Sequence, residues 1–373
     1  MTPFDTILHR QLDKRREAGN YRTLSVPNGL IDFCSNDYLG LARSSELKHA
    51  IDLTLQNAGV ILANGSTGSR LITGNSAYAE SVEQQLAQLF KSEAALVFGS
   101  GYLANLAVLS SVPQKGDIVL YDEYAHASIK DGLRLSHAQR FAYRHNDLND
   151  LEKKLKRYPA ARWVVTESIF SMDGDVCPLQ PLADLAQQHN AHVILDEAHS
   201  TGILGPEGAG LAVASHVHQK IAVRIHTFGK GVGVHGACVV GSASLKSYLI
   251  NVARPFIYTT GPSPHSWASI EAAFVWIASH PHLQQQLSEK IGLFRDGAKG
   301  NDAISPIVSV AAPGNAHAKQ AAKKLQQAGF DVRPILSPTV KVGSERLRIC
   351  IHAFNSEKEI RDLTTLLKKE NLI

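Results

Sequence analysis

The stretch TFGKGVGVHG, residues 227–236, places a single lysine, Lys230, among small residues. Short apolar runs flank it at 221–223 and 237–240, so we expect Lys230 on a tight loop between two buried strands. Desolvation lowers the pKa of an amine, and a neutral amine is the form that makes a Schiff base. The stretch is therefore typical of a catalytic lysine, although a surface lysine in a glycine-rich hairpin remains open at this point.

Two nucleotide-binding motifs also match the sequence in this region, but the neighbouring residues lack the features that each motif requires. Residues 231–236 match G-x-G-x-x-G, but an apolar strand follows instead of the helix and distant acid that a dinucleotide site requires. Residues 196–199 spell DEAH, but no G-x-x-x-x-G-K-[ST] loop lies upstream to hold a triphosphate. Both interpretations are excluded.

Length and composition describe an ordinary globular enzyme-sized chain. With 373 residues, 44% hydrophobic and 19% charged, it can bury a large core, and we expect one large and one smaller domain. The net charge of +4 comes without a basic block, so nucleic-acid binding is not predicted. The first residues show no basic region followed by an apolar one, and no apolar run of 18 or more residues occurs, so we expect neither a signal peptide nor a membrane span.

The cysteines and other potential metal ligands are scattered. The four cysteines, Cys34, Cys177, Cys238 and Cys350, form no C-x-x-C pair and are expected to be reduced thiols of a cytoplasmic protein. No His/Cys/Asp/Glu set has the spacing of metal ligands, so no metal is predicted.

From about residue 95 the chain alternates short apolar runs with helical segments, which predicts an α/β fold with a mostly parallel sheet covered by helices. The expected strands are 95–98, 117–121, 139–143, 163–166, 192–195, 224–227 and 238–241. The expected helices include 2–19, 45–58, 76–90, 104–111, 150–157, 182–189, 264–279 and 283–294. From about residue 304 the order strand, helix, strand, strand, helix predicts a smaller α+β domain. The predicted divisions are an N-terminal helix and extended segment (1–44), a large domain (45–280) and a small C-terminal domain (281–373).

Polar residues follow the predicted strands, where open α/β sheets bind their ligands. The turn at 99–102 opens a helix and is either an anion site or a plain strand-to-helix connection. Asp196 ends a buried strand, so its carboxylate needs a partner, either a structural cation or a protonated ring nitrogen that His199 would also reach. His126, taken alone, is more typical of a helix-capping or core histidine than of a functional one.

Together these motifs resemble the fold-type I enzymes that use pyridoxal 5'-phosphate (PLP), and within them the α-oxoamine synthases. Residues 227–236 meet every position of the pattern T-x-[STAG]-K-[SAG]-x-[SAG]-x-x-[SAG], and the glycine-aromatic turn, a histidine and Asp-x-x-His precede it in the family's order. The resemblance extends from SNDYLGL at 35–41 to RLR at 346–348. It implies the PLP-dependent transferase fold, PLP as cofactor, and a homodimer with shared active sites.

The resemblance also implies residue roles. Lys230 would hold PLP covalently and move a proton, Asp196 would keep the ring nitrogen protonated, and His126 would stack on the ring. The other expected cofactor contacts are Gly101, Tyr102, Ser171, His199, Thr227 and, lent by the second subunit, Thr260. The expected substrate contacts are Arg22, Asn36, His126, Thr339 and Arg348, with Arg348 as the clamp for the amino-acid carboxylate.

The implied reaction is the decarboxylative condensation of an amino acid with an acyl thioester. Gly236-Ala237 and the segments IYTT (257–260) and SPTV (337–340) are similar to the biotin-pathway members, which join L-alanine to pimeloyl-CoA or a pimeloyl carrier protein. The alternatives are glycine-using or serine-using relatives. A non-catalytic PLP-binding protein is a further alternative, but binding alone would not need Lys230, Asp196, His126 and Arg348 together.

Two positions depart from the family pattern. The helix after residue 74 usually carries H-x-x-L-E, and here Ala79 stands where the histidine would be. His235 replaces a more frequent small residue near the lysine, and a spacer and a substrate contact are equally compatible with it.

Overall fold

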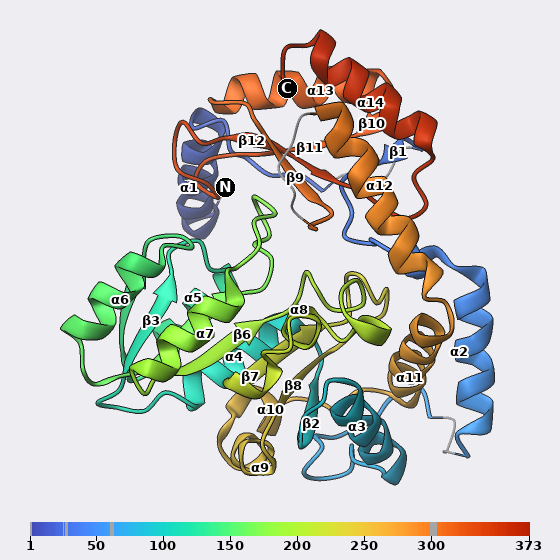
Figure 1. Cartoon of the computed structure of the whole chain (residues 1–373). Helices are drawn as coiled ribbons and strands as arrows, with labels where there is room; N and C mark the ends of the chain where they lie inside the picture. Colours follow the sequence, from blue (N-terminus) through green and yellow to red (C-terminus); the bar gives the residue numbers. More distant parts are fainter. Residues whose placement is uncertain (1, 25, 27–28, 60–62, 299–303) are drawn as a thin grey trace. The chain divides into compact units, whose positions relative to one another are not determined.

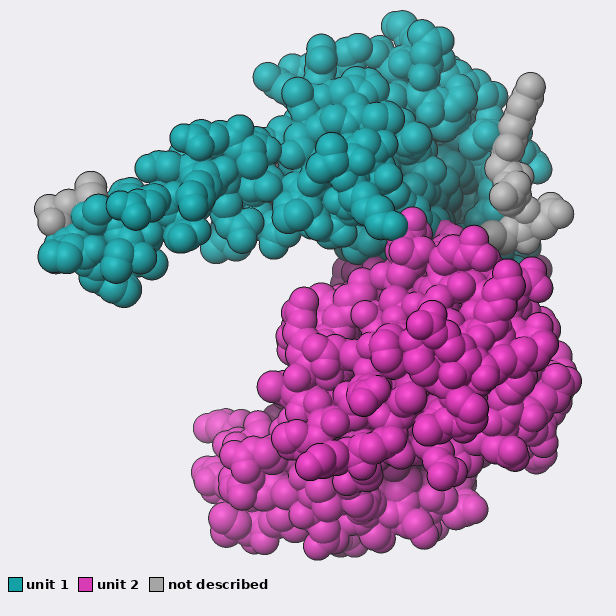
Figure 2. Space-filling model, turned by 90° about the vertical axis from the view of Figure 1, so that its left-hand side faces the viewer, with its two compact units in different colours: residues 1–35, 172–174, 288–373 teal, residues 36–171, 175–287 magenta. Residues whose placement is uncertain are grey.

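The computed structural model of the chain describes residues 2–24, 26, 29–59, 63–298 and 304–373. Its contacts divide the chain into two compact units, coloured separately in Figure 2. The smaller unit combines Met1–Ser35, Met172–Gly174 and Ser288–Ile373, and the larger unit combines Asn36–Ser171 and Asp175–Leu287. The domain boundaries expected near residues 44 and 280 stay a prediction.

The larger unit is built on a seven-stranded sheet with the order β2-β8-β7-β6-β5-β3-β4 (Figure 1). Its strands are β2 (Ala94–Phe98), β3 (Ile118–Asp122), β4 (Gln139–Tyr143), β5 (Ala161–Glu167), β6 (His192–Asp196), β7 (Ile221–Thr227) and β8 (Ala237–Gly241). Among these strands, β8 runs antiparallel to both of its neighbours, β2 and β7, and the other pairs are parallel. The predicted mostly parallel sheet is confirmed, and every expected strand lies within three residues of its predicted ends.

Helices surround this sheet. They are α2 (Ser45–Asn57), α3 (Ala77–Leu89), α4 (Gly101–Ser111), α5 (Ala127–Leu135), α6 (Leu148–Arg157), α7 (Leu179–Gln188), α8 (Leu211–Ala214), α9 (Ala243–Val252), α10 (Arg254–Ile257) and α11 (Pro264–Ser279). Serine starts several of them: the hydroxyls of Ser44, Ser76 and Ser100 each accept the N–H three residues further on. These caps satisfy amides that have no partner within a first helical turn.

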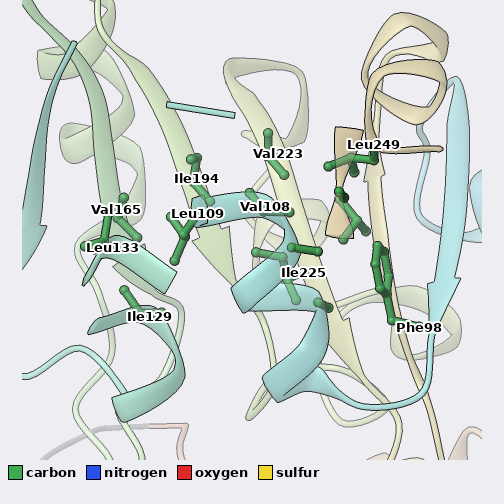
Figure 3. Close-up of a cluster of buried hydrophobic side chains, with 14 of the residues drawn as sticks. Phe98, Val108, Leu109, Ile129, Leu133, Val165, Ile194, Val223, Ile225 and Leu249 are labelled. Carbon is green, nitrogen blue, oxygen red and sulfur yellow. The ribbon is translucent and has the colours of Figure 1, made fainter. Parts of the chain in front are cut away.

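Alternating strand residues divide the core between the two faces of the sheet. Val165 and Ile194 pack with Val108, Leu109 and Ile129 of α4 and α5, as the sticks in Figure 3 show. The residues next to them in the strands, Val164, Val193 and Leu195, belong to a second cluster with α6 and α7. Because neighbouring strand residues point to opposite faces, one run of buried apolar residues binds helices on both sides.

The smaller unit contains α1 (Pro3–Glu17), a three-stranded antiparallel sheet of β11 (Arg333–Ile335), β12 (Arg346–Cys350) and β9 (Ile307–Ala311), and the helices α13 (Asn315–Gln327) and α14 (Glu357–Lys369). Both chain ends contribute, since β1 (Ile31–Asp32) pairs in parallel with β10 (Phe330–Asp331). The predicted order of elements after residue 304 is confirmed, with β10 as an addition. A two-residue strand shows no periodicity that could predict it.

Helix α1 begins near the N-terminus, and helix α12 (His282–Ala298) spans the boundary between the two units. Thr2 caps α1 through a capping box with Asp5, and α1 ends at Glu17, two residues before the predicted Gly19. Helix α12 begins in the larger unit and continues in the smaller one. None of the helices in the described ranges is long and apolar enough to cross a membrane.

Candidate active site

Most of the predicted cofactor residues lie just after four neighbouring strands of the larger unit. In sheet order these strands are β7, β6, β5 and β3. Thr227 ends β7 and Asp196 ends β6, whereas Ser171 and His126 follow β5 and β3 within a few residues. Parallel strands end at the same edge of a sheet, so this edge gathers residues that are far apart in the chain.

Lys230 lies in the loop between β7 and β8, where backbone contacts fix its position. Two backbone hydrogen bonds join Phe228, at the start of the loop, to residues near its end. The Phe228 N–H donates to Gly236 O (2.9 Å), and the Phe228 carbonyl accepts from the Val234 N–H (3.1 Å). Gly231 has no room for a side chain, because a Cβ there would lie 2.8 Å from Thr201 O. The Lys230 side chain is half-buried, and its Nζ lies 2.8 Å from His199 Nε2.

Asp196 is a buried carboxylate that neutral donors hold in place. It is 5% exposed, and its Oδ1 accepts from the Ala198 N–H (2.8 Å) while its Oδ2 accepts from Asn105 Nδ2 (2.6 Å). Within the described residues, no lysine or arginine forms an ion pair with Asp196. A buried negative charge without a protein cation is the arrangement that a protonated ring nitrogen would complete.

His126 is the N-cap of α5, and hydrogen bonds fix both its backbone and its ring. Its backbone N–H donates to Glu167 Oε1 (2.5 Å), and its Nδ1 accepts from the Ser128 N–H (3.2 Å). Asn105 Nδ2 also donates to Ser128 Oγ (3.1 Å), so one amide connects the surroundings of His126 and Asp196. The residue is exposed to solvent, and partial desolvation of its ring lowers the pKa of His126.

Glu167, which accepts the His126 backbone N–H, is a second buried carboxyl group. It is 3% exposed at the end of β5, opposite Asp196 in the strand register. Burial, with the nearby Asp196 charge, raises the pKa of Glu167 above its ordinary value. Since two adjacent buried carboxylates repel each other, this environment favours the protonated form of Glu167.

The first turn of α4 lies directly against the end of β7. A Cβ placed on Gly101 would be 2.0 Å from Thr227 Oγ1, so these two predicted cofactor contacts are neighbours. Tyr102, the second residue of the helix, is partly exposed, and its hydroxyl donates to Asp131 Oδ2 (2.5 Å). Amides at a helix N-terminus beside a threonine hydroxyl form a setting that suits a phosphate.

The remaining predicted residues lie in other settings. In the smaller unit, Arg22 Nη2 donates to Thr339 Oγ1 (3.2 Å), and Arg348 is buried in β12 with its Nη1 3.0 Å from Cys350 Sγ. In the larger unit, Asn36 and Ser171 are half-buried. Thr260 is exposed, and the next residue, Gly261, donates its N–H to Gly68 O (2.9 Å).

The structure adds residues to which the sequence gave no role. Tyr38 contacts His199, Asn105 holds Asp196, and Glu167 holds His126. A signal existed only for Asn105, a polar residue in the middle of the apolar helix α4. Tyr38 lies within the family-like stretch SNDYLGL, but nothing in that stretch indicates its partner.

A cavity of about 240 Å³ lies elsewhere in the larger unit and contains none of the predicted site residues. In its lining, buried Glu83 forms ion pairs with Arg70 Nη1 and Lys246 Nζ, each at 2.8 Å. Among the described residues, no group of three or more His, Cys, Asp or Glu is arranged to hold a metal ion.

Comparisons with known proteins agree over nearly the whole chain. The family model for class I and II aminotransferases matches residues 28–367. A putative 8-amino-7-oxononanoate synthase of Bacillus licheniformis is 41% identical over 96% of this chain and 95% of that protein. The 8-amino-7-oxononanoate synthase 2 of Bacillus subtilis is 40% identical over 96% of each.

Solved structures share the fold. Serine palmitoyltransferase from S. paucimobilis with a bound PLP–myriocin aldimine superposes with a TM-score of 0.88 and 27% identity over 100% of both chains. The 8-amino-7-oxononanoate synthase from Francisella tularensis gives a TM-score of 0.77 and 28% identity, covering 92% of this chain and 100% of that one.

Proposed function

The chain belongs to the class I and II aminotransferase family, and we propose that it is a PLP-dependent acyltransferase that makes 8-amino-7-oxononanoate for biotin biosynthesis. It would condense L-alanine with pimeloyl-CoA, or with a pimeloyl carrier protein, and release CO2 and the free thiol. The observation that carries PLP chemistry is the buried Asp196 carboxylate without a protein cation, next in the sheet to the strand that leads to Lys230. The names of the relatives supply the product, and the resemblance of the motifs to the biotin-pathway enzymes supplies the substrates.

The residues present fit PLP at each of its polar groups. Asp196 would face the ring nitrogen, and the amides of Gly101 and Tyr102 with Thr227 Oγ1 would hold the phosphate. Lys230 would form the covalent link, with His199 and Ser171 near the ring hydroxyl and His126 over the ring. When bound, PLP supplies an electron sink that stabilises negative charge on the amino-acid Cα.

The chain's own side chains would then position the amino acid and move its proton. Lys230 Nζ is the proposed base for the Cα proton, and its contact with His199 Nε2 limits where that nitrogen can lie. Arg348 is proposed to bind the substrate carboxylate through its planar guanidinium, which matches a carboxylate in shape. Arg22, Asn36 and Thr339 are proposed as further substrate contacts.

A serine palmitoyltransferase-like activity is the second candidate, because serine palmitoyltransferase structures give the higher TM-scores. Their sequence identity to this chain, 26–27%, is close to the 28% of the Francisella tularensis synthase, so it does not separate the two. The 40–41% identity of the Bacillus proteins favours the alanine-using activity. A 2-amino-3-ketobutyrate CoA ligase activity and PLP binding without turnover complete the alternatives.

Thiol release over a substrate panel tests the proposal. Purified PLP-loaded protein is mixed with L-alanine, glycine or L-serine and with pimeloyl-CoA, acetyl-CoA or palmitoyl-CoA. We expect L-alanine with pimeloyl-CoA to give the highest kcat/KM, by roughly a hundredfold over the other pairs. The Lys230→Ala variant should lose roughly a thousandfold or more of this rate and should no longer be labelled by borohydride reduction.

Any other result of the thiol-release panel would indicate a different function. Preference for serine and palmitoyl-CoA, or for glycine and acetyl-CoA, would replace the proposal by the corresponding relative. Yellow protein that releases no thiol from any pair would indicate a binding protein without turnover. The predicted homodimer and the cytoplasmic location are further parts of the proposal.

A further inference from the structure

A buried chain of hydrogen bonds runs from Asn36 to Lys230. Tyr38 OH donates to Asn36 Oδ1 (3.0 Å) and lies 2.7 Å from His199 Nδ1, whose ring continues to Lys230 Nζ at 2.8 Å from Nε2. Tyr38 is 0% exposed and His199 is 3% exposed. The central two members of the chain are thus shielded from water, where hydrogen-bond direction matters most.

The direction of each bond follows from the number of protons. The Tyr38 hydroxyl has one hydrogen, and because it donates that hydrogen to Asn36, its oxygen can only accept from His199 Nδ1. A neutral imidazole that carries its hydrogen on Nδ1 has a lone pair on Nε2. His199 therefore offers an acceptor to Lys230, and an ammonium group, which can only donate, matches that acceptor.

The backbone around Tyr38 is fixed relative to the Lys230 loop. Asp37 Oδ1 accepts from the Ala42 N–H (3.0 Å), and its Oδ2 pairs with Arg43 Nε (3.0 Å), so the turn after Tyr38 is closed. Gly233 in the Lys230 loop packs on this turn, since a Cβ at Gly233 would lie 2.6 Å from Ala42 N. The two segments meet backbone to backbone, which leaves the Tyr38 hydroxyl little freedom to move away from His199.

We propose that Tyr38 is a positioning residue that holds His199 in the Nδ1–H tautomer and thereby presents His199 Nε2 as an acceptor to Lys230. The opposite tautomer would point an N–H at the ammonium and would push the lysine away. The tautomer rests on the hydrogen-bond geometry alone, whereas its consequence for catalysis rests on the proposed function. Fixing the second nitrogen of a histidine is a common way to set the chemistry of the first.

Nitrogen-15 NMR of the histidine rings tests this on the full-length protein freed of cofactor, near neutral pH. Ring nitrogens with and without hydrogen have separate signals, and the His199→Gln variant identifies those of His199. We expect wild-type His199 to carry its hydrogen on Nδ1, and the Tyr38→Phe variant to show a second signal from Nε2–H, because only the Lys230 contact then favours the Nδ1–H form. Tyr143→Phe is the matched control, because it removes another buried hydroxyl (to Val165 O, 3.4 Å) and should leave the His199 signals unchanged.

If Tyr38→Phe does not fold, the wild-type tautomer and the Asn36→Asp variant still test the proposal. Asn36→Asp preserves an acceptor for the Tyr38 hydroxyl and should keep the Nδ1–H signal. Wild-type His199 with hydrogen on Nε2, or a Tyr38→Phe spectrum identical to wild type, would overturn the proposal. The NMR result does not depend on turnover, so a protein that shows the expected tautomer but releases no thiol would refute the proposed function alone.

Discussion

Two histidines, half-buried His145 and buried His226, show that neighbouring groups can shift the pKa of a histidine in opposite directions. His145 Nδ1 lies 3.0 Å from Asp122 Oδ1 and its Nε2 lies 2.7 Å from Asp175 Oδ2. Burial alone would lower its pKa, but the hydrogen bonds to Asp122 and Asp175 raise the pKa of His145 to about 9. His226 is stacked on Phe90 and is near Arg224, and burial with that positive charge holds its pKa well below the ordinary value.

This difference gives His145 a pH-dependent role in stability. Its pKa is raised on folding, from 6.5 to about 9, so its stabilisation is complete below about pH 6.5 and is lost as the pH rises through 9. The shift corresponds to about 3 kcal/mol of unfolding free energy at most. We expect His145→Gln to lower the urea midpoint clearly near pH 6 and little above pH 9. A difference from wild type that is the same at both pH values would contradict this role.

At the scale of elements, the junction between α4 and β7 depends on a glycine. Ser100 caps α4, and the next residue, Gly101, lies so close to Thr227 that a Cβ would be 2.0 Å from its Oγ1. Gly101 has no positive φ, so its requirement comes from space rather than from backbone conformation. The helix start and the strand end can therefore lie this close together only if this residue lacks a side chain.

Gly101→Ala should accordingly disturb both stability and cofactor binding. The added methyl group would force the helix and the strand apart, which we expect to cost about 1–3 kcal/mol. Gly99→Ala is the control, because a Cβ there would make an ordinary 3.7 Å contact with Leu103. Urea midpoints and PLP titration by absorbance would compare the two variants. Equal PLP affinity in both would show that the Gly101 contact does not support the phosphate site.

At the scale of the whole molecule, exposed apolar residues lie near Thr260. Ile72 is 80% exposed and Tyr258 is 72% exposed. Their segments are held together, because Ser66 Oγ donates to Gly261 O (2.5 Å) and Gly261 N–H donates to Gly68 O (2.9 Å). A surface of this kind commonly marks a protein interface, which supports the predicted homodimer.

Light scattering tests that assembly. We expect a particle of twice the chain mass of 40.4 kDa, and specific activity that falls on dilution as subunits separate. Ile72→Asp should shift the protein towards the chain mass and reduce its activity, since a buried charge would destabilise the interface. A monomer with full activity would contradict both the dimer and the role of Thr260 as a residue lent to the second subunit.

Local patterns in the sequence were sufficient for most of the fold and for the composition of the site. Apolar runs predicted all the strands of the large sheet, and the helices expected at 45–58 and 76–90 correspond to α2 and α3. The order of motifs around Lys230 and Asp196 indicated the cofactor. These features are readable because each is carried by residues close together in the chain.

Only the tertiary structure decided how the site residues are held. Tyr38 and His199 are 161 residues apart, and Asn105 and Asp196 are 91 apart, yet each pair forms a short hydrogen bond. The pairing of β1 with β10 joins the two ends of the chain in the same way. A single sequence has no periodicity at such distances, because these contacts depend on which strands the fold places side by side.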